Sequence, residues 1–240
     1  MNPPTITSKY NRILLKISGE SFGAQGVSNF EQANNIVEEI VKLHKKRVEI
    51  GLVIGGGNII RGSVIAKSGI SRVVGDYMGM LATVINGLLL QELLNQAGAK
   101  AKLMTSKVIE GIGELYQYQK CLDYFSQGNI VIFAGGTGNP YFTTDTTAAL
   151  RAAEISADCF FKATKVDGVY SDDPMTNPDA KKFDNLTYQD VLIKSYKAMD
   201  ITAISFCMEN KIPIFVFNLL TKGNLLKAIQ GEKIGTLISS

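Results

Sequence analysis

Short apolar stretches alternate with stretches of helical spacing along the whole chain of 240 residues. The apolar stretches end in polar or glycine-containing turns, as buried strands do. This alternation predicts an α/β fold with a mainly parallel central sheet sandwiched between helices. The expected strands are residues 12–17, 50–54, 102–104, 129–133, 159–162, 213–217 and 236–238.

Several stretches between these strands are predicted to be helices, and one has an unusual composition. Residues 28–46 and 146–154 have the spacing of helices that bury one face. The stretch 78–94 is apolar almost all round, so a helix there must be covered on more than one side. Thr83 and Asn86 lie inside this stretch and argue against a membrane span, so we expect a second subunit to cover it.

Length and composition predict one globular domain over residues 1–240, with residues 1–11 as a flexible N-terminal tail. A hydrophobic share of 45% is enough to bury a substantial core. The net charge of +3 is dispersed, apart from a cluster of cations at residues 45–47. That cluster ends a predicted helix, where positive charge suits the helix dipole, so we expect no nucleic-acid partner.

The cysteines and the N-terminus indicate where the protein works. Cys121, Cys159 and Cys207 are far apart in the sequence, and the single histidine, His44, is remote from them. This spacing fits neither a zinc site nor a disulfide framework, and we expect no metal-ligating residues. Residues 1–5 lack the features of a secretory leader. The sequence therefore predicts a cytoplasmic protein without membrane contact.

The turn after the strand at 129–133 carries the richest chemistry. Residues 134–145 combine glycines, an amide, hydroxyls and a carboxylate, a mixture that packing does not require. Backbone N–H groups freed by glycine conformations, next to a helix N-terminus, form a receptor for an anion or a polar ring. The simpler alternative is a left-handed turn followed by a helix cap at Asp145.

Two more polar loops follow strands, at residues 18–19 and 55–58. Ligands bind beyond the carboxyl ends of parallel strands, so the three loops should converge on one crevice. Neither the P-loop nor the dinucleotide-binding fingerprint occurs in the sequence. Phosphate chemistry would then depend on the nearby cations Lys16, Arg61 and Lys162, because phosphoryl transfer needs positioning and charge neutralisation. Either lysine alone could instead simply extend to solvent from a strand end.

The motifs at 16–20, 53–58, 61–62, 73–80, 136–145 and 162–170 closely resemble those of the bacterial UMP kinases of the amino acid kinase superfamily. The first and last are typical of the superfamily, and those at 73–80 and 137–145 of its UMP-specific branch. The resemblance runs from about Arg12 to the C-terminus. It implies an amino acid kinase-like fold and a nucleoside monophosphate kinase that transfers the γ-phosphoryl group of MgATP to UMP, giving UDP and ADP, in pyrimidine nucleotide biosynthesis.

The resemblance also assigns site residues. It implies an acceptor-binding part at roughly residues 12–157 and an ATP-binding part at roughly 158–240. It implies ATP contacts at Lys16, Ile17, Ser18, Gly19, Gly57, Arg61, Thr164, Tyr170 and Asp173. It implies UMP contacts at Gly56, Asp76, Thr137, Gly138, Asn139, Pro140, Tyr141, Phe142, Thr143 and Thr144, with Asp76 taking the ribose hydroxyls. It implies catalytic roles for Lys16, Arg61, Asp145, Lys162 and Asp200, the carboxylates orienting lysines or water bound to Mg²⁺.

Three of these carboxylates have alternative interpretations. Asp145 and Asp200 each precede a helical pattern and could be no more than N-caps, and Asp76 could be both a cap and a ligand. The family resemblance further implies a homohexamer built from dimers, with GTP as an activator and UTP as an inhibitor. The loop at 20–28 is shorter than in the enterobacterial members, in a region that bears on GTP activation.

Two other functions compete with UMP phosphorylation. A kinase for a carboxylate or carbamate acceptor would need a cation where this chain has Asp76, which would repel such a substrate. A nucleotide sensor without turnover would not need Lys16, Arg61 and Lys162 aimed at a transition state.

Overall fold

A computed structural model of the chain describes residues 8–24, 27–28, 30–60, 68–196 and 198–240. Within these residues the central sheet consists of β1 (Arg12–Ile17), β4 (Glu49–Ile54), β5 (Ala101–Thr105), β6 (Glu114–Leu115), β7 (Ile130–Ala134), β8 (Cys159–Thr164), β11 (Asn185–Thr187), β12 (Ile214–Asn218) and β13 (Thr236–Ser239). Their order across the sheet is β11-β13-β12-β8-β1-β4-β7-β5-β6. Every neighbouring pair is parallel except β12 and β13. The predicted mainly parallel sheet is therefore confirmed.

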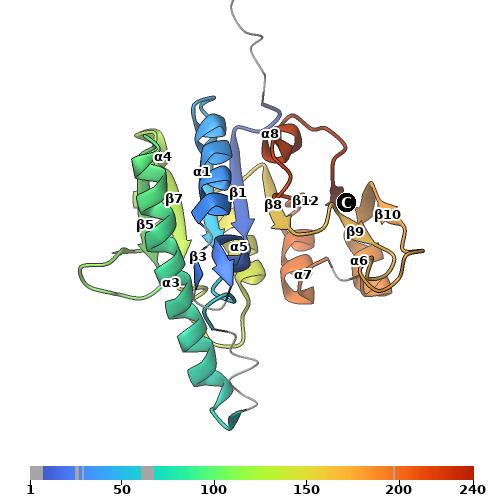
Figure 1. Cartoon of the computed structure of the whole chain (residues 1–240), viewed down its shortest axis with the longest axis horizontal. Coiled ribbons are helices and arrows are strands. Elements are labelled where there is room, and N and C mark those ends of the chain that lie inside the picture. The colour runs from blue at the N-terminus through green and yellow to red at the C-terminus, as the bar shows by residue number, and fades with distance from the viewer. Residues whose placement is uncertain (1–7, 25–26, 29, 61–67, 197) are drawn as a thin grey trace, which may run out of the picture.

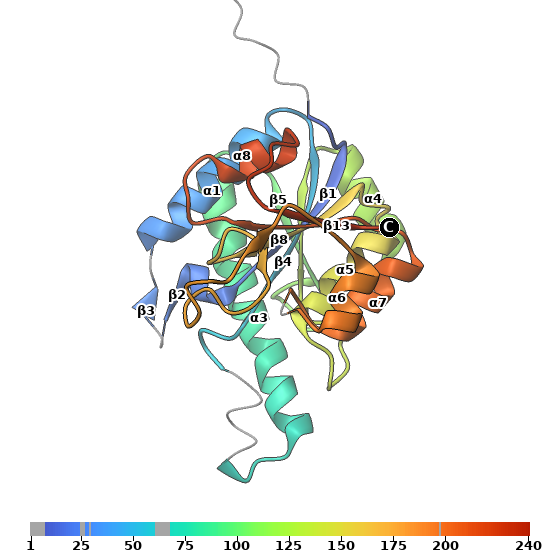
Figure 2. The same cartoon turned by 90° about the vertical axis from the view of Figure 1, so that its right-hand side faces the viewer.

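Helices cover both faces of this sheet (Figures 1 and 2). The helices are α1 (Phe30–His44), α3 (Arg72–Gln96), α4 (Tyr118–Ser126), α5 (Thr144–Glu154), α6 (Tyr188–Lys194), α7 (Ile201–Glu209) and α8 (Asn224–Ile229), with a 3-10 turn, η1 (Gly19–Phe22). Figure 2 shows α1, α3 and α8 on one side of the sheet and α4 to α7 on the other. Alternate residues of β1 belong to the two hydrophobic cores: Ile13 and Leu15 to one, Leu14 to the other. The chain is thus a three-layer sandwich.

Most predicted strands match the observed ones to within two residues at each end. The sequence missed the short edge strands β6 and β11. It also missed two small antiparallel ribbons, β2 (Gly23–Ala24) with β3 (Val27–Ser28) and β9 (Val169–Tyr170) with β10 (Lys182–Phe183). The edge strands and ribbons are two or three residues long, too short to show the alternation that identifies a strand.

Helix α3 is longer than predicted and extends past the sheet at its N-terminal end (Figure 1). By length and composition it is the one described helix that could cross a membrane. Its buried side packs on the core through Leu90 and Leu94. Leu81 and Ile85, on the other side, are each 56% exposed. The prediction that this helix is covered on more than one side therefore does not hold within a single chain.

The expected flexible tail differs from the structure at residues 8–11. Tyr10 is buried, and its ring centroid lies 5.3 Å from that of Phe161 in the sheet. The backbone N–H of Lys9 donates to the carbonyl oxygen of Ile229 in α8 at 3.2 Å. These residues are therefore fixed against the body, because an aromatic ring in this stretch finds an apolar site. Residues 1–7 lie outside the described part of the chain.

Candidate active site

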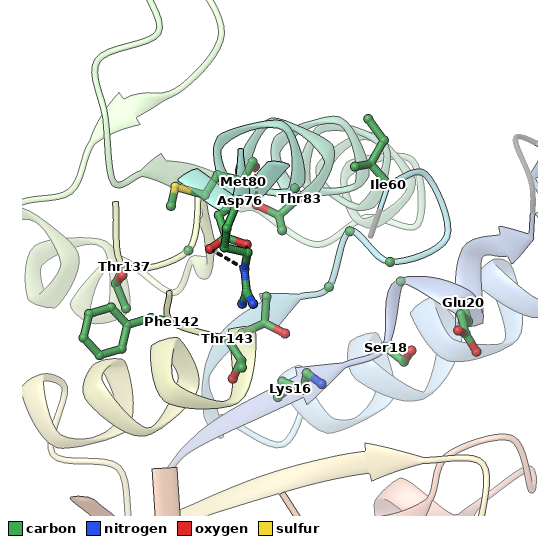
Figure 3. Close-up of a pocket in the computed structure, with 18 residues that line it drawn as sticks. Lys16, Ser18, Glu20, Ile60, Asp76, Met80, Thr83, Thr137, Phe142 and Thr143 are labelled. Carbon is green, nitrogen blue, oxygen red and sulfur yellow. Dashed lines mark hydrogen bonds and ion pairs between the residues drawn. The ribbon is translucent and has the colours of Figure 1, made fainter. Parts of the chain in front are cut away.

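A crevice of about 450 Å³ opens beside α3 at the carboxyl ends of β1, β4 and β7 (Figure 3). Its lining residues are Lys16, Ser18, Gly19, Glu20, Gly55, Gly56, Gly57, Ile60, Arg72, Asp76, Gly79, Met80, Thr83, Gly136, Thr137, Phe142, Thr143 and Thr144. All three polar loops identified in the sequence contribute. Their predicted convergence on one crevice is confirmed.

Glycine lets the first two loops approach each other and α3 closely. A Cβ atom on Gly19 would overlap the carbonyl oxygen of Gly55, and one on Gly56 would lie 2.8 Å from the Cβ atom of Ala82 in α3. Only residues without a side chain fit there. Both loops consequently present backbone groups to the crevice, as a receptor for phosphate oxygens requires.

Two buried polar residues of α3 fix these loops. The hydroxyl oxygen of Thr83 accepts a hydrogen bond from the backbone N–H of Gly135 at 2.7 Å. The side-chain amide of Asn86 donates to the carbonyl oxygen of Gly55 at 2.7 Å and to the side-chain oxygen of Asn58 at 2.8 Å. The polar residues that interrupt the apolar pattern of α3 therefore hold the second and third loops in place.

Two lysines on adjacent strands lie at or beside the crevice: Lys16 lines it, while Lys162 and the carboxylate of Asp145 lie next to Lys16 and outside the lining. Lys16 of β1 and Lys162 of β8 are register partners in the sheet, so their side chains project from the same face. The Nζ atom of Lys16 lies 2.8 Å from Oδ1 of Asp145, and that of Lys162 lies 2.6 Å from Oδ2. Both lysine side chains are only 13% exposed. One carboxylate thus bridges two largely buried ammonium groups.

These charges perturb one another strongly. Burial alone would raise the pKa of Asp145, but Lys16 and Lys162 outweigh burial and lower that pKa to about 2. Burial lowers the pKa of Lys162 from its ordinary value, and the nearby carboxylate opposes this only in part. The carboxylates of Asp145 and Asp200 both act on Lys162. The two ammonium groups remain the donors that suit a phosphoryl group.

Asp145 reaches the lysines because it is not the helix cap. The N-cap of α5 is Thr143, whose hydroxyl oxygen accepts from the backbone N–H groups of Asp145 and Thr146 at 3.0 and 3.2 Å. Asp145 therefore lies in the first turn of α5, with its side chain directed toward β1 and β8. The cap interpretation of Asp145 was wrong, because a hydroxyl two residues earlier takes that position.

Asp200 is an N-cap, one of the two roles that the sequence left open, while its catalytic role stays a prediction. It is the N-cap of α7, and its carboxylate accepts from the backbone N–H of Ala203 at 2.8 Å. The same carboxylate accepts hydrogen bonds from the hydroxyls of Thr143 and Thr146. Asp200 thereby ties the start of α7 to the start of α5, beside the crevice.

Asp76 lies in the second turn of α3 and is not a cap. Ser71 is the N-cap, and its hydroxyl accepts from the N–H of Val74 at 3.4 Å. The Asp76 carboxylate instead accepts from Nε of Arg72 and, at 2.8 Å, from the backbone N–H of Tyr141. Figure 3 shows Asp76 across the crevice from Lys16. The predicted acceptor carboxylate and the lysine therefore face the same space from opposite walls.

The loop after β7 contributes only some of its predicted residues. Those that line the crevice are Thr137, Phe142, Thr143 and Thr144. Those that do not are Gly138, Asn139, Pro140 and Tyr141. Asn139 is exposed, and its backbone N–H donates to the hydroxyl oxygen of Thr137 at 3.2 Å. Its amide side chain is therefore outside the crevice, and the loop reaches the crevice through its hydroxyls and Phe142.

A second pocket, of about 250 Å³, holds two of the predicted ATP residues, Tyr170 and Asp173. The hydroxyl of Tyr170 donates to the Asp167 carboxylate at 2.5 Å, and this bond raises the pKa of Tyr170 to about 12. Thr164 lines neither pocket and donates to the carbonyl oxygen of Val166 at 2.5 Å. Ile17 is fully buried in the core, so its side chain is structural.

Arg61 lies outside the described residues, while the structure adds crevice residues that the sequence did not indicate. Among these are Arg72, Met80 and Thr83 of α3. With Asp76 they recur at helical spacing, which places them on one face of α3. The spacing of Arg72 and Asp76, one helical turn apart, is the signal that could have identified this arginine.

No cluster of three or more potential metal ligands occurs in the described residues. Asp145 is bound by two lysines, and Asp200 by a backbone N–H and two hydroxyls. Mg²⁺ in nucleotide sites is commonly bound by substrate phosphates and water rather than by a protein cage. The residues present therefore fit a magnesium ion that arrives with its nucleotide.

The chain is similar to known proteins over its full length. The model of the amino acid kinase family matches residues 11–218. A uridylate kinase of Photobacterium profundum is 48% identical over 240 residues, which cover 99% of each chain. A uridylate kinase of Bacteroides thetaiotaomicron is 49% identical over 233 residues, 96% of this chain and 99% of that protein.

Solved structures show the same similarity. The UMP kinase from Bacillus anthracis superposes with a TM-score of 0.92 at 35% identity and covers 96% of each chain. The UMP kinase from Ureaplasma parvum superposes with a TM-score of 0.90 at 34% identity, over 97% of this chain and 100% of that one.

Proposed function

Because the chain belongs to the amino acid kinase family, in which it is a nucleoside monophosphate kinase that phosphorylates UMP with ATP, we propose how its crevice divides this work. The observation that carries the proposal is the position of Lys16 opposite Asp76 (Figure 3), with Lys16 and Lys162 bridged by Asp145. Cations on one wall suit the transferred phosphoryl group, and a carboxylate on the other suits sugar hydroxyls.

The donor half of the proposal centres on the two lysines. Lys16 and Lys162 neutralise charge on the transferred group, and Asp145 fixes the direction of both ammonium groups. Backbone groups at Gly19 and Gly57 receive the other phosphate oxygens. Mg²⁺, bound to the ATP phosphates, supplies further neutralisation.

The proposal also gives roles to the second pocket, to Asp200 and to Arg61. The adenosine of ATP occupies the second pocket beside Tyr170 and Asp173, because that pocket offers an aromatic ring and a carboxylate. Asp200 orients Thr143 and Thr146 at the start of α5. Arg61, outside the described residues, is proposed to add a cation on the second glycine loop.

The acceptor half lies between α3 and the loop after β7. Asp76 accepts hydrogen bonds from the ribose hydroxyls of UMP, and the loop from Thr137 to Thr144 holds the uracil and the acceptor phosphate. Gly56 brings the second glycine loop close to α3, so that its backbone borders the acceptor half of the crevice. Gly138, Asn139, Pro140 and Tyr141 act through the backbone of the loop.

The reaction is a direct displacement in this proposal. An oxygen of the UMP phosphate attacks the γ-phosphorus, the bond from that phosphorus to the bridging oxygen of ATP breaks, and ADP leaves. No covalent intermediate on the protein is required, because the protein positions both nucleotides and neutralises the transferred group.

We also propose an assembly for the chain. Val74, Tyr77, Leu81 and Ile85 give α3 an exposed apolar stripe, and such stripes mark subunit interfaces. A homohexamer built from dimers paired along α3 would cover it. GTP activation, UTP inhibition, a role in pyrimidine biosynthesis and a cytoplasmic location remain expectations from the family resemblance.

The division of the crevice is tested by two variants with opposite kinetic effects. Lys16→Ala should lower kcat by about 100- to 1000-fold while UMP affinity stays near normal, because its contacts strengthen as the phosphoryl group transfers. Asp76→Asn should raise the KM for UMP and spare kcat at saturation. Lys42→Ala, which removes a cation on the exposed face of α1, is the matched control.

Steady-state ADP release and calorimetric titration with UMP provide the measurements. Near-normal kcat in Lys16→Ala, or unchanged UMP affinity in Asp76→Asn, would contradict the division. A panel with CMP and small carboxylic acids tests the acceptor class. UMP should exceed CMP in kcat/KM by orders of magnitude, because hydrogen bonds matched to uracil have reversed polarity at cytosine.

A further inference from the structure

We infer that Arg72 is a positioning residue for the acceptor, because it fixes the direction of the Asp76 carboxylate. The Arg72–Asp76 pair in turn holds the backbone of Tyr141, which keeps the loop after β7 against α3. The inference rests on the proposed role of Asp76 toward ribose. It assigns selectivity for the 2′-hydroxyl to an arginine that need not touch the sugar.

The pair has the geometry of a fixed contact. The Nε atom of Arg72 lies 2.8 Å from Oδ1 and 2.9 Å from Oδ2 of Asp76, one helical turn away. The Asp76 side chain is only 12% exposed, and both residues line the crevice. An exposed ion pair at this spacing usually contributes little. Here the carboxylate is largely covered, so its orientation is set by its partners and not by solvent.

A second donor completes the arrangement from the other side of the crevice. The backbone N–H of Tyr141 donates to Oδ2 of Asp76 at 2.8 Å, joining residues that are 65 positions apart. A carboxylate offers about four acceptor sites. The contacts from Arg72 and Tyr141 fill part of this set on the protein side. Oδ1 receives one of these contacts and Oδ2 receives two, so the site that remains for a ribose hydroxyl is on Oδ1.

Tyr141 has an unusual backbone conformation that this contact supports. Its φ is +71°, in the left-handed region that residues with a side chain rarely adopt. Such conformations persist where surrounding contacts enforce them, and they concentrate at ligand sites. The guanidinium carbon of Arg72 lies 5.7 Å from the centroid of the Tyr141 ring, within the range of a cation–π contact. Arg72 therefore contacts both the carboxylate and the residue that the carboxylate holds.

The consequence is measurable as a preference between two acceptors. UMP and 2′-deoxy-UMP differ only in the 2′-hydroxyl, which would donate a hydrogen bond to a fixed Asp76 carboxylate. Loss of a hydrogen bond to a charged group commonly lowers kcat/KM by about 10- to 100-fold. Without Arg72, the Asp76 carboxylate can turn away from the sugar. Arg72→Ala should therefore lose most of this discrimination between UMP and 2′-deoxy-UMP, although Asp76 itself is not substituted.

The test is a double-mutant cycle of Arg72→Ala and Asp76→Asn, with kcat and KM measured for both acceptors. We expect Arg72→Ala to raise the KM for UMP about tenfold, to change kcat at saturation by less than about threefold, and to reduce the UMP/2′-deoxy-UMP ratio about tenfold. The double variant should resemble Asp76→Asn alone, because both substitutions remove the same interaction between Asp76 and the ribose. Lys42→Ala, in the exposed pair with Glu38 on α1, should leave the ratio unchanged.

Each other outcome has a definite meaning. If Arg72→Ala lowers kcat/KM equally for both acceptors, and additively with Asp76→Asn, Arg72 acts on another part of the nucleotide and the inference is wrong. If Asp76→Asn itself leaves the ratio and the KM unchanged, the proposed ribose role of Asp76 fails instead. Arg72→Gln keeps a donor but not the charge, and it carries the same comparison if Arg72→Ala does not fold.

Discussion

Replacing Asp145 by asparagine tests the centre of the site, because it removes one negative charge and almost no volume. In the native chain this carboxylate lies 2.8 Å from the ammonium of Lys16 and 2.6 Å from that of Lys162. Asparagine leaves two cations on neighbouring strands without a counter-charge. We therefore expect Asp145→Asn to destabilise the fold and to disorganise both lysines.

Two estimates give the size of the effect. The pKa of Asp145 is lowered to about 2, against an ordinary value of about 4, and a shift of about two units corresponds to roughly 2–3 kcal/mol. Removal of one partner from a buried ion pair destabilises by about 3–5 kcal/mol. We expect the free energy of unfolding at pH 7 to fall by about 3 kcal/mol.

The pH dependence distinguishes this cause from a loss of packing. Because the folded pKa of Asp145 lies below the unfolded one, its stabilisation is complete above about pH 4 and is lost as the pH falls toward about 2. The stability difference between the native chain and Asp145→Asn should therefore shrink over that window. Lys162, whose pKa is already lowered by burial, should have a still lower pKa in the variant.

Urea unfolding from pH 7 to pH 2.5, followed by circular dichroism, measures these differences. Asp179→Asn makes the same chemical change at an exposed loop position and serves as control. A loss below about 1 kcal/mol at pH 7, or a difference that stays constant down to the lowest pH, would refute the reasoning. Activity at 25 °C should fall together with stability, because Lys16 and Lys162 lose their common anchor.

Three more predictions follow from single features. Tyr170→Ala should raise the KM for ATP about tenfold in steady-state kinetics and leave the KM for UMP unchanged, because Tyr170 lines only the second pocket; an equal effect on UMP would contradict this. Ile85→Lys should dissociate the assembly in light scattering, because it charges the exposed stripe of α3; a monomeric parent chain would exclude that interface. Gly56→Ala should lower the free energy of unfolding by about 1–3 kcal/mol, seen as a lower Tm, because its Cβ atom would lie 2.8 Å from that of Ala82. Gly79→Ala, with open space at its Cβ position, should not lower Tm.

The elements of the sheet were predictable because their signal is local. Buried strands such as β1, β7 and β12 are continuous apolar runs with sharp ends, and the loops after them carry glycine or hydroxyl residues. The edge strands β6 and β11 lack that signal, since two or three residues show no periodicity. The convergence of the polar loops could also be predicted, because parallel strands end at one side of a sheet.

The contacts within the site could not be predicted, because they depend on which strands are neighbours. Lys16 and Lys162 lie 146 positions apart, and only the adjacency of β1 and β8 brings their side chains together. Likewise, the local pattern around Asp145 fits a cap as well as a catalytic group, and only the structure shows that the hydroxyl of Thr143 takes the cap position. Arg72 was also missed. Its ion pair with Asp76 is local in the sequence, but its contact with Tyr141, which places it at the site, is not.

The register pairing of Lys16 with Lys162 places the proposed phosphoryl-transfer groups on a different part of the fold from the groups proposed to select the acceptor. Phosphoryl transfer and acceptor choice can therefore change independently over evolution. The groups proposed to act on the phosphoryl donor belong to neighbouring strands in the middle of the sheet, where substitutions disturb the core on both sides. The groups proposed to choose the acceptor belong to α3 and to the loop after β7, where sequence change is better tolerated. Descendants of such a scaffold can acquire new acceptors by exchanging a loop while inheriting the same phosphoryl chemistry.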